Sequence, residues 1–214
     1  MPDAKISGLK AAYRQRKPVI RQRLLEFQKR GLGNDSEIFS ELAFCICTPQ
    51  TNAKQCDAAV NGLLGKSLLK AGKPSIEKAL SKKVRFHRNK ASYIVQARSL
   101  LMPGIRLKLE SLGVESEPAK ARQWLAKNVK GLGMKEASHF LRNIGFGSDL
   151  AILDRHVLKN LLELGAIGEL PKAISEKNYL HLEKSMRRFS RRVKIPMGEL
   201  DLLFWSNETG EVFK

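Results

Sequence analysis

The stretch that decides the fold is Val129-Lys130-Gly131-Leu132-Gly133-Met134-Lys135-Glu136-Ala137. It joins a helical pattern over Trp124–Val129 to a second one that continues to Ile144. Because Gly131 and Gly133 carry no side chains, backbone N–H groups at the start of the second helix can approach a phosphate closely. Such a contact reads no base, so this helix-hairpin-helix suits a protein that scans DNA. Taken alone, the turn is equally compatible with a plain connection between helices.

The rest of the chain also shows helical spacing of its apolar residues. Pro18–Arg30 forms one such pattern, and a second, which Ser36 can cap, is nearly apolar all round toward its end and predicts a central buried helix. Thr51 or Asn52 can cap the next helix. No segment alternates convincingly with a period of two, so the sequence predicts an all-α fold.

The charge balance points to a polyanionic partner. The 214 residues include 39 Lys and Arg against 21 Asp and Glu, which gives a net charge of +18. Nucleic acid is the commonest partner of so basic a protein, and an anionic membrane surface is the alternative. No apolar run is long enough to span a bilayer, and no signal-peptide pattern opens the chain. We therefore expect a cytoplasmic protein that does not enter membranes.

Three cysteines lie close together in the sequence, at Cys45, Cys47 and Cys56. They fall in an apolar stretch, which favours buried thiols in a reducing compartment. No fourth ligand lies nearby and no Cys-x-x-Cys pair occurs, so we expect no metal site and no cofactor.

Two residues near the hairpin suggest chemistry. Lys135 lies on the first turn of its second helix, and Asp154 follows in Ala151-Ile152-Leu153-Asp154-Arg155-His156-Val157. Each has a simpler interpretation, Lys135 as a surface or phosphate-binding lysine and Asp154 as a helix N-cap. Together with the hairpin, they resemble the helix-hairpin-helix–Gly/Pro–Asp superfamily of base-excision DNA glycosylases. Ala151-Ile152 stands where that superfamily often has a proline before the aspartate.

Within the superfamily the chain resembles the archaeal-type (type 2) 8-oxoguanine DNA glycosylase/lyases over nearly its whole length. The stretches that carry this resemblance are Glu41–Thr48, Arg85–Arg88, Lys135–Asn143, Glu199–Leu202 and the tail from Trp205 to Gly210. The endonuclease III branch usually has a four-cysteine iron–sulfur loop near its C-terminus, and here no cysteine follows Cys56.

The resemblance implies a bifunctional enzyme that acts on double-stranded DNA containing oxidised guanine. The damaged nucleotide must swing out of the stack to be reached. Lys135 then attacks C1′, expels the base and forms a Schiff base that permits β-elimination, while Asp154 stabilises the cationic sugar. A neighbouring cation such as Arg155 would help to keep the attacking amine neutral. We expect the enzyme to act as a monomer.

The resemblance also assigns the contacts with DNA. Each has a structural alternative, namely core packing for the aromatic residues, capping for the polar residues and His156, and simple packing for the tail. Phe86 and Trp205 would stack on the base from both sides, and its Watson–Crick edge would be bound by Asp201 and the Lys214 carboxylate. The residues beside the unpaired partner base would be Gln50, Thr51 and Asn52. The DNA backbone would be contacted by Gly131, Gly133, Arg155 and His156.

The family organisation predicts two helical subdomains. Residues 1–49 and 154–214 would form one, and residues 50–153 the other, with the hairpin (about 124–145) at the cleft between them. Two other functions stay open: an oxidised-pyrimidine glycosylase/lyase without an iron–sulfur cluster, and a non-catalytic helix-hairpin-helix module in which Lys135 only contacts phosphate.

Overall fold

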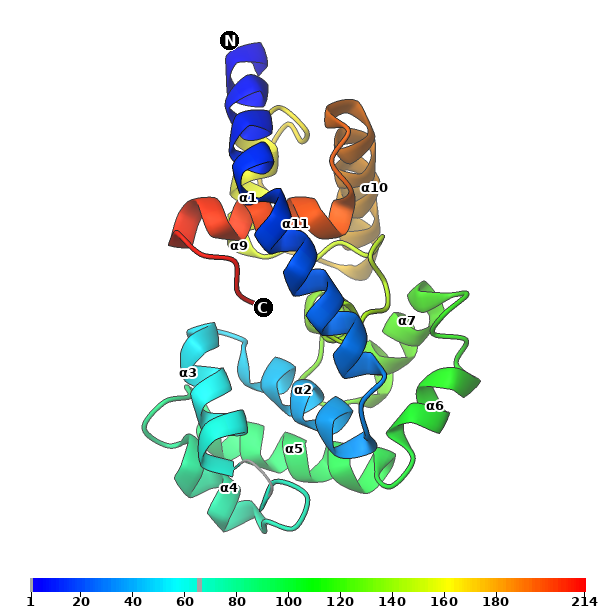
Figure 1. Cartoon of the computed structure of the whole chain (residues 1–214). Helices are drawn as coiled ribbons and strands as arrows, with labels where there is room; N and C mark the ends of the chain where they lie inside the picture. The colour runs from blue at the N-terminus through cyan, green and yellow to red at the C-terminus, as the bar shows by residue number, and fades with distance from the viewer. Residues whose placement is uncertain (1, 65–66) are drawn as a thin grey trace. The chain divides into compact units, whose positions relative to one another are not determined.

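The computed structural model describes residues 2–64 and 67–214, and within them every regular element is a helix, as the sequence predicts (Figure 1). The elements are α1 (Pro2–Gly31), α2 (Asp35–Cys47), α3 (Ala53–Asp57), the π-helix η1 (Ala58–Leu64), α4 (Lys73–Leu80), α5 (His87–Leu101), α6 (Ile105–Ser111), α7 (Pro118–Asn128), α8 (Met134–Asn143), α9 (Arg155–Glu163), α10 (Glu176–Val193) and α11 (Met197–Thr209). None of the helices in this described part is long and apolar enough to cross a membrane.

The chain divides into two compact units, and their boundaries differ from the expected ones. The terminal unit combines the chain up to Phe27 with Gly147–Lys214, and the central unit is Gln28–Phe146. Residues 28–49 belong to the central unit because α2 packs against α5 and α8. Residues 147–153 belong to the terminal unit, where the backbone N–H of Ala151 donates to Glu183 Oε2 at 2.9 Å.

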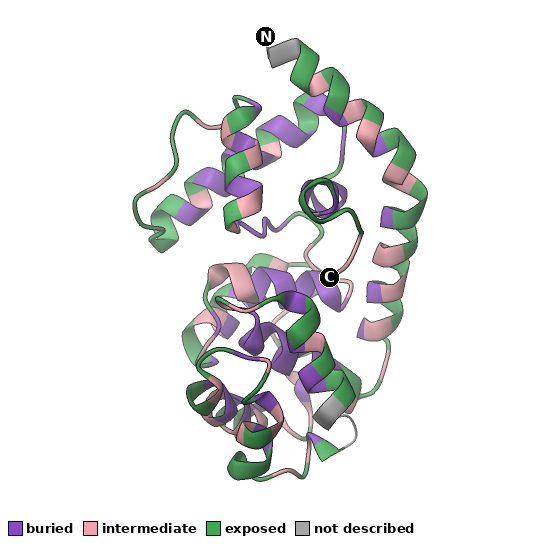
Figure 2. Cartoon of the chain, turned by 90° about the vertical axis from the view of Figure 1, so that its left-hand side faces the viewer, coloured by how far each residue is buried: buried purple, intermediate pink, exposed green. Residues whose placement is uncertain are grey.

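Helix α2 forms the centre of the central unit, where it contacts α5, α6, α8 and η1 (Figure 1). Its buried positions run almost without interruption from Ile38 to Cys47, which confirms the expected buried helix (Figure 2). The side chain of Asn34, not that of Ser36, caps it by accepting from the Glu37 backbone N–H at 3.0 Å. The Glu37 carboxylate accepts in return from the Asn34 N–H, so this capping box fixes the start of the helix two residues earlier.

A buried polar contact fixes α8 against α2. Asn143 Nδ2 donates to Glu41 Oε1 at 2.7 Å, and Arg30 NH1 lies 3.1 Å from Glu41 Oε2. Both Glu41 and Asn143 are buried, and a buried charge is tolerated only when it is paired in this way. The contact therefore sets the position of the helix that carries Lys135.

The terminal unit is built from α1, α9, α10 and α11. Helix α11 is buried along Met197–Phe204, and Tyr13 of α1 donates a 2.5 Å hydrogen bond to Glu199 Oε2. Burial, followed by this contact with Glu199, raises the pKa of Tyr13 to about 12. On α1 the buried residues Leu9, Tyr13, Ile20 and Phe27 recur at helical spacing (Figure 2).

Candidate active site and nucleic-acid interface

Helices α7 and α8 pack together and are joined by the turn at residues 129–133, so the central unit contains the predicted hairpin. Gly131 has φ +93°, and a Cβ on it would lie 2.6 Å from Cδ2 of Tyr93. Both the backbone and the close ring therefore require glycine at this position. Gly133 has an ordinary φ of −95°, and its N–H donates to Glu136 Oε2 at 3.2 Å.

Lys135 lies on the first turn of α8, and about a quarter of its side chain is exposed. Its Nζ lies 3.4 Å from Glu136 Oε1, while the other oxygen of Glu136 binds the turn. Burial raises the pKa of the Cys56 thiol to about 11, and the charges of Lys90 and Lys135 oppose this shift. The charge of Lys135 therefore acts on Cys56, which lies in α3, the helix that follows the Gln50–Asn52 loop.

The Gln50–Asn52 loop is held by its own side chains. Asn52 caps α3 by accepting from the Gln55 N–H at 3.3 Å, which is the expected structural role. Thr51 Oγ1 accepts from the Arg85 N–H at 3.2 Å. Gln50 is exposed and has φ +56°, a left-handed conformation that non-glycine residues rarely adopt.

Phe86 does not pack in the core, although core packing was its simpler interpretation. Its side chain is 54% exposed, and its φ of +57° is left-handed. The Arg85 guanidinium carbon lies 5.5 Å from the ring centroid. Large exposed apolar side chains on strained backbone are typical of binding sites.

Asp154 is the N-cap of α9 in the terminal unit. Its Oδ1 accepts from the backbone N–H groups of His156 and Val157, both at 2.8 Å. The structural interpretation of Asp154 is therefore correct. It is compatible with catalysis, because both bonds use the same oxygen and the residue is only half-buried.

His156 and Trp205 form an edge-on ring pair, with centroids 5.6 Å apart and an interplanar angle of 89°. Glu208 Oε2 lies 3.8 Å from His156 Nδ1, and the exposed Arg155 donates to Nε2 at 3.3 Å. Nε1 of Trp205 is buried and has no hydrogen-bond partner among the described residues. Trp205 as a whole residue is half-buried.

The C-terminal tail folds back after Gly210, whose φ of +84° is left-handed. Arg23 NH2 on α1 donates to the Val212 carbonyl at 3.5 Å, and Lys214 is buried. Asp201 on α11 is buried as well. The tail is therefore held within the terminal unit by its contact with α1.

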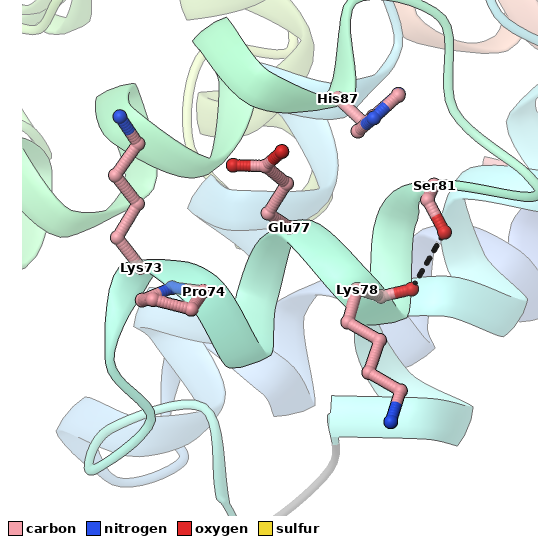
Figure 3. A pocket seen from close by; sticks show the side chains of 6 residues that line it. All are labelled: Lys73, Pro74, Glu77, Lys78, Ser81 and His87. Carbon is pink, nitrogen blue, oxygen red and sulfur yellow. Dashed lines mark hydrogen bonds between the residues drawn. The ribbon is translucent and has the colours of Figure 1, made fainter.

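The central unit has a surface pocket of about 430 Å³ formed by α4 and the start of α5. Figure 3 shows the residues that line it: Lys73, Pro74, Glu77, Lys78, Ser81 and His87. None of them is among the candidate site residues, although His87 directly follows Phe86. No group of three His, Cys, Asp or Glu side chains in residues 2–64 and 67–214 is arranged to hold a metal ion.

The chain is similar in sequence to a known protein family and to individual known proteins. A family model described as 8-oxoguanine DNA glycosylase matches residues 20–195. An 8-oxoguanine DNA glycosylase/AP lyase from Fusobacterium nucleatum is 42% identical over 204 residues, which is 94% of each chain. One from Methanocaldococcus jannaschii is 39% identical over 199 residues, 92% of this chain and 93% of that one.

Two solved structures are also similar. The 8-oxoguanine DNA glycosylase of Thermotoga maritima has a TM-score of 0.90 and 32% identity, with both chains fully covered. The Methanocaldococcus jannaschii 8-oxoguanine glycosylase/lyase, in complex with a 15mer DNA containing 8-oxoguanine, has a TM-score of 0.89 and 36% identity and covers 99% of this chain and 100% of that one.

Proposed function

The chain belongs to the 8-oxoguanine DNA glycosylase family, and we propose that it removes 8-oxoguanine from double-stranded DNA through a Schiff base at Lys135 and then cleaves the abasic strand. The observation that carries this proposal is the position of Lys135, a partly exposed lysine on the first turn of the second hairpin helix. Hairpin N–H groups bind phosphate without reading sequence. Phosphate binding can therefore bring Lys135 next to any nucleotide that the enzyme extrudes.

Lys135 attacks C1′ as a neutral amine. The new C–N bond replaces the glycosidic bond, and the base leaves with that electron pair and takes up a proton. Glu136 Oε1, 3.4 Å from Nζ, is close enough to receive the amine proton after a small movement. The sugar ring then opens to the imine, a proton leaves C2′, and the 3′ phosphate departs.

Asp154 stabilises the positive charge that develops on the sugar during attack. Its two hydrogen bonds to the start of α9 fix the carboxylate direction before DNA binds. A charge held in place in this way needs little reorganisation in the transition state. This role requires Asp154 and Lys135 to reach the same sugar in the DNA complex.

The lesion is recognised by stacking and by hydrogen-bond acceptors. Phe86 and Trp205 offer aromatic faces, each stack being worth roughly 1–3 kcal/mol. The Asp201 carboxylate and the terminal carboxylate of Lys214 can accept from guanine-type N–H donors. Gln50 is the loop residue best suited to enter beside the partner base, because Thr51 and Asn52 already serve the loop itself. Arg155 and His156, at the start of α9, would contact the DNA phosphates.

Borohydride trapping tests the proposal. A duplex with one 8-oxoguanine should yield a covalent adduct with the wild type and none with Lys135→Gln, since only the reduction of an imine between the lysine and the sugar joins the protein stably to the DNA. Lys130→Gln is the matched control, because Lys130 is an exposed hairpin lysine whose Nζ lies 5.6 Å from the Tyr93 ring centroid. Adduct formation by Lys135→Gln would disprove the role of Lys135. Trapping only on duplexes with an oxidised pyrimidine would assign the other substrate, and no adduct on any duplex would indicate a binding module.

A further inference from the structure

Lys90 is a buried lysine that the chemistry above does not use. Only 4% of it is exposed, and its Nζ donates three hydrogen bonds. The acceptors are the Cys47 carbonyl at 2.8 Å, the Pro49 carbonyl at 2.7 Å and Thr51 Oγ1 at 3.1 Å. An ammonium group has three donors, so these acceptors satisfy it fully.

The acceptors of Lys90 lie on both sides of Gln50. The Pro49 carbonyl and the Thr51 hydroxyl are held by one nitrogen, so the chain must turn sharply at the residue between them. Gln50 meets this demand with its left-handed φ of +56°. Such a conformation persists in a non-glycine residue only when its surroundings enforce it.

The same lysine also reaches Phe86. Thr51 Oγ1 accepts from the Arg85 N–H at 3.2 Å while it accepts from Lys90. Lys90 lies one turn after Phe86, and its backbone N–H donates to the Phe86 carbonyl at 3.0 Å. Of the two left-handed residues of this region, Gln50 is therefore flanked directly by acceptors of the buried ammonium, and Phe86 is linked to that ammonium through Thr51 and the Arg85 N–H.

The environment of Lys90 is built for an ammonium group in spite of burial. Burial lowers the pKa of Lys90, and the nearby Arg85 charge adds to this effect, while Glu136 acts in the opposite direction. Two carbonyl dipoles and a hydroxyl oxygen around one nitrogen favour the charged form, because charge-assisted hydrogen bonds are stronger than neutral ones. An apolar residue of the same length would leave these carbonyls without their donor.

We propose that Lys90 is a positioning residue for lesion recognition, which holds Gln50 and Phe86 so that insertion beside the partner base and stacking on the extruded base occur together. This inference rests on the proposed function of the chain. Removing the ammonium would release the loop around Gln50 and, through Thr51, loosen the turn at Arg85 and Phe86. It would leave the hairpin and Lys135 in place, because their contacts come from Tyr93, Glu136 and α2.

The test separates base recognition from the lysine chemistry. Lys90→Met removes the donors and keeps the side-chain length, and single-turnover excision of 8-oxoguanine should fall by roughly 10- to 100-fold, as expected when reacting groups are misplaced by about 1 Å. Cleavage of a duplex with a preformed abasic site needs no stacking on the lesion, although the partner base is still present, and it should fall clearly less than excision does. With 2-aminopurine opposite the lesion, saturating wild-type enzyme should change the fluorescence more than saturating Lys90→Met.

Arg98→Met is the matched control. Arg98 lies on the same helix, and its NH1 donates to the carbonyls of Leu68 and Ala71, both at 2.8 Å. It therefore holds a loop by the same kind of contact but away from Gln50 and Phe86. Arg98→Met should have equal and small effects on excision and on abasic cleavage.

Two outcomes would overturn the proposal: excision by Lys90→Met within twofold of wild type, or equal losses in excision and abasic cleavage. If Lys90→Met does not fold, Lys90→Gln retains two donors, and the same comparison applies to it with a smaller loss of excision. The wild-type reactions in the same assay test the proposed function separately, since an enzyme without excision or trapping would refute that function whatever the variants do.

Discussion

The hairpin turn offers a prediction whose size follows from the structure. Substituting Gly131 by Ala forces an L-residue to keep φ +93°, which costs about 1–2 kcal/mol. Its Cβ would also lie 2.6 Å from the Tyr93 ring, and overpacking of this kind costs about 1–3 kcal/mol. The reduced entropy of the unfolded chain offsets about 0.4–1 kcal/mol. Gly131→Ala should therefore lower the free energy of unfolding by about 1–5 kcal/mol.

A double-mutant cycle with Tyr93→Ala separates the two costs. Without the ring only the backbone cost remains, so Gly131→Ala should cost about 1 kcal/mol or less in this background. Urea unfolding measures the free energy of unfolding of the wild type, the two single variants and the double variant. Titration with undamaged duplex measures the DNA affinity, which depends on the conformation of the turn. Affinities for undamaged and damaged DNA should fall by the same factor, because the turn contacts phosphate and not bases.

The cycle can also refute the reasoning. Equal costs of Gly131→Ala in both backgrounds would show that the Tyr93 ring does not shape the turn. An unchanged free energy of unfolding in the single variant would show that the left-handed backbone is not needed. A loss of affinity for damaged DNA alone would mean that the turn reads the lesion.

Three further outcomes are expected. Asp154→Asn should slow excision by orders of magnitude, because the charge is lost. The thermal unfolding temperature should stay near that of wild type, since the amide oxygen can still cap α9. Near-normal excision would exclude an electrostatic role for Asp154. Tyr13 has a folded pKa of about 12, above its ordinary value of 10.0, so its stabilising contribution is present below pH 10 and is lost as the pH rises toward 12. Chemical unfolding should show this loss of about 2–3 kcal/mol in the wild type and not in Tyr13→Phe, and identical pH profiles would contradict it. Deletion of Phe213-Lys214 should impair excision of 8-oxoguanine far more than cleavage of an abasic site, and equal losses would assign the tail to folding alone.

The parts of the site that depend on local backbone rules could be predicted from the sequence. Gly131 had to be glycine because the hairpin turn needs a left-handed residue, and Asp154 was recognisable as a cap because it precedes an apolar helical pattern. The start of α2 was predicted wrongly, since Asn34 and Ser36 are both good caps. Only the reciprocal bond from Glu37 decides between them.

Lys90 and Phe86 illustrate what local rules cannot provide. Lys90 lies in a strongly basic segment, and nothing local distinguishes it from the exposed lysines around it. Its acceptors Cys47 and Pro49 lie about forty residues earlier, at separations of 43 and 41. The left-handed φ of Phe86 is equally invisible, because aromatic residues rarely adopt it and only tertiary contacts enforce it. The Glu136 bond to Gly133 could have been found, since a glutamate three residues after a helix cap is a known signal.

The division of the chain has a consequence for synthesis on the ribosome. The central unit is one uninterrupted segment, so all of its partners emerge in order and it can fold while translation continues. The terminal unit cannot, because Tyr13 bonds to Glu199, which is 186 residues later. At roughly 5–20 residues per second, Tyr13 waits on the order of 10–40 s for its partner. During that interval α1 belongs to the nascent chain, and its apolar side is accessible to chaperones. The terminal unit therefore forms after the central unit.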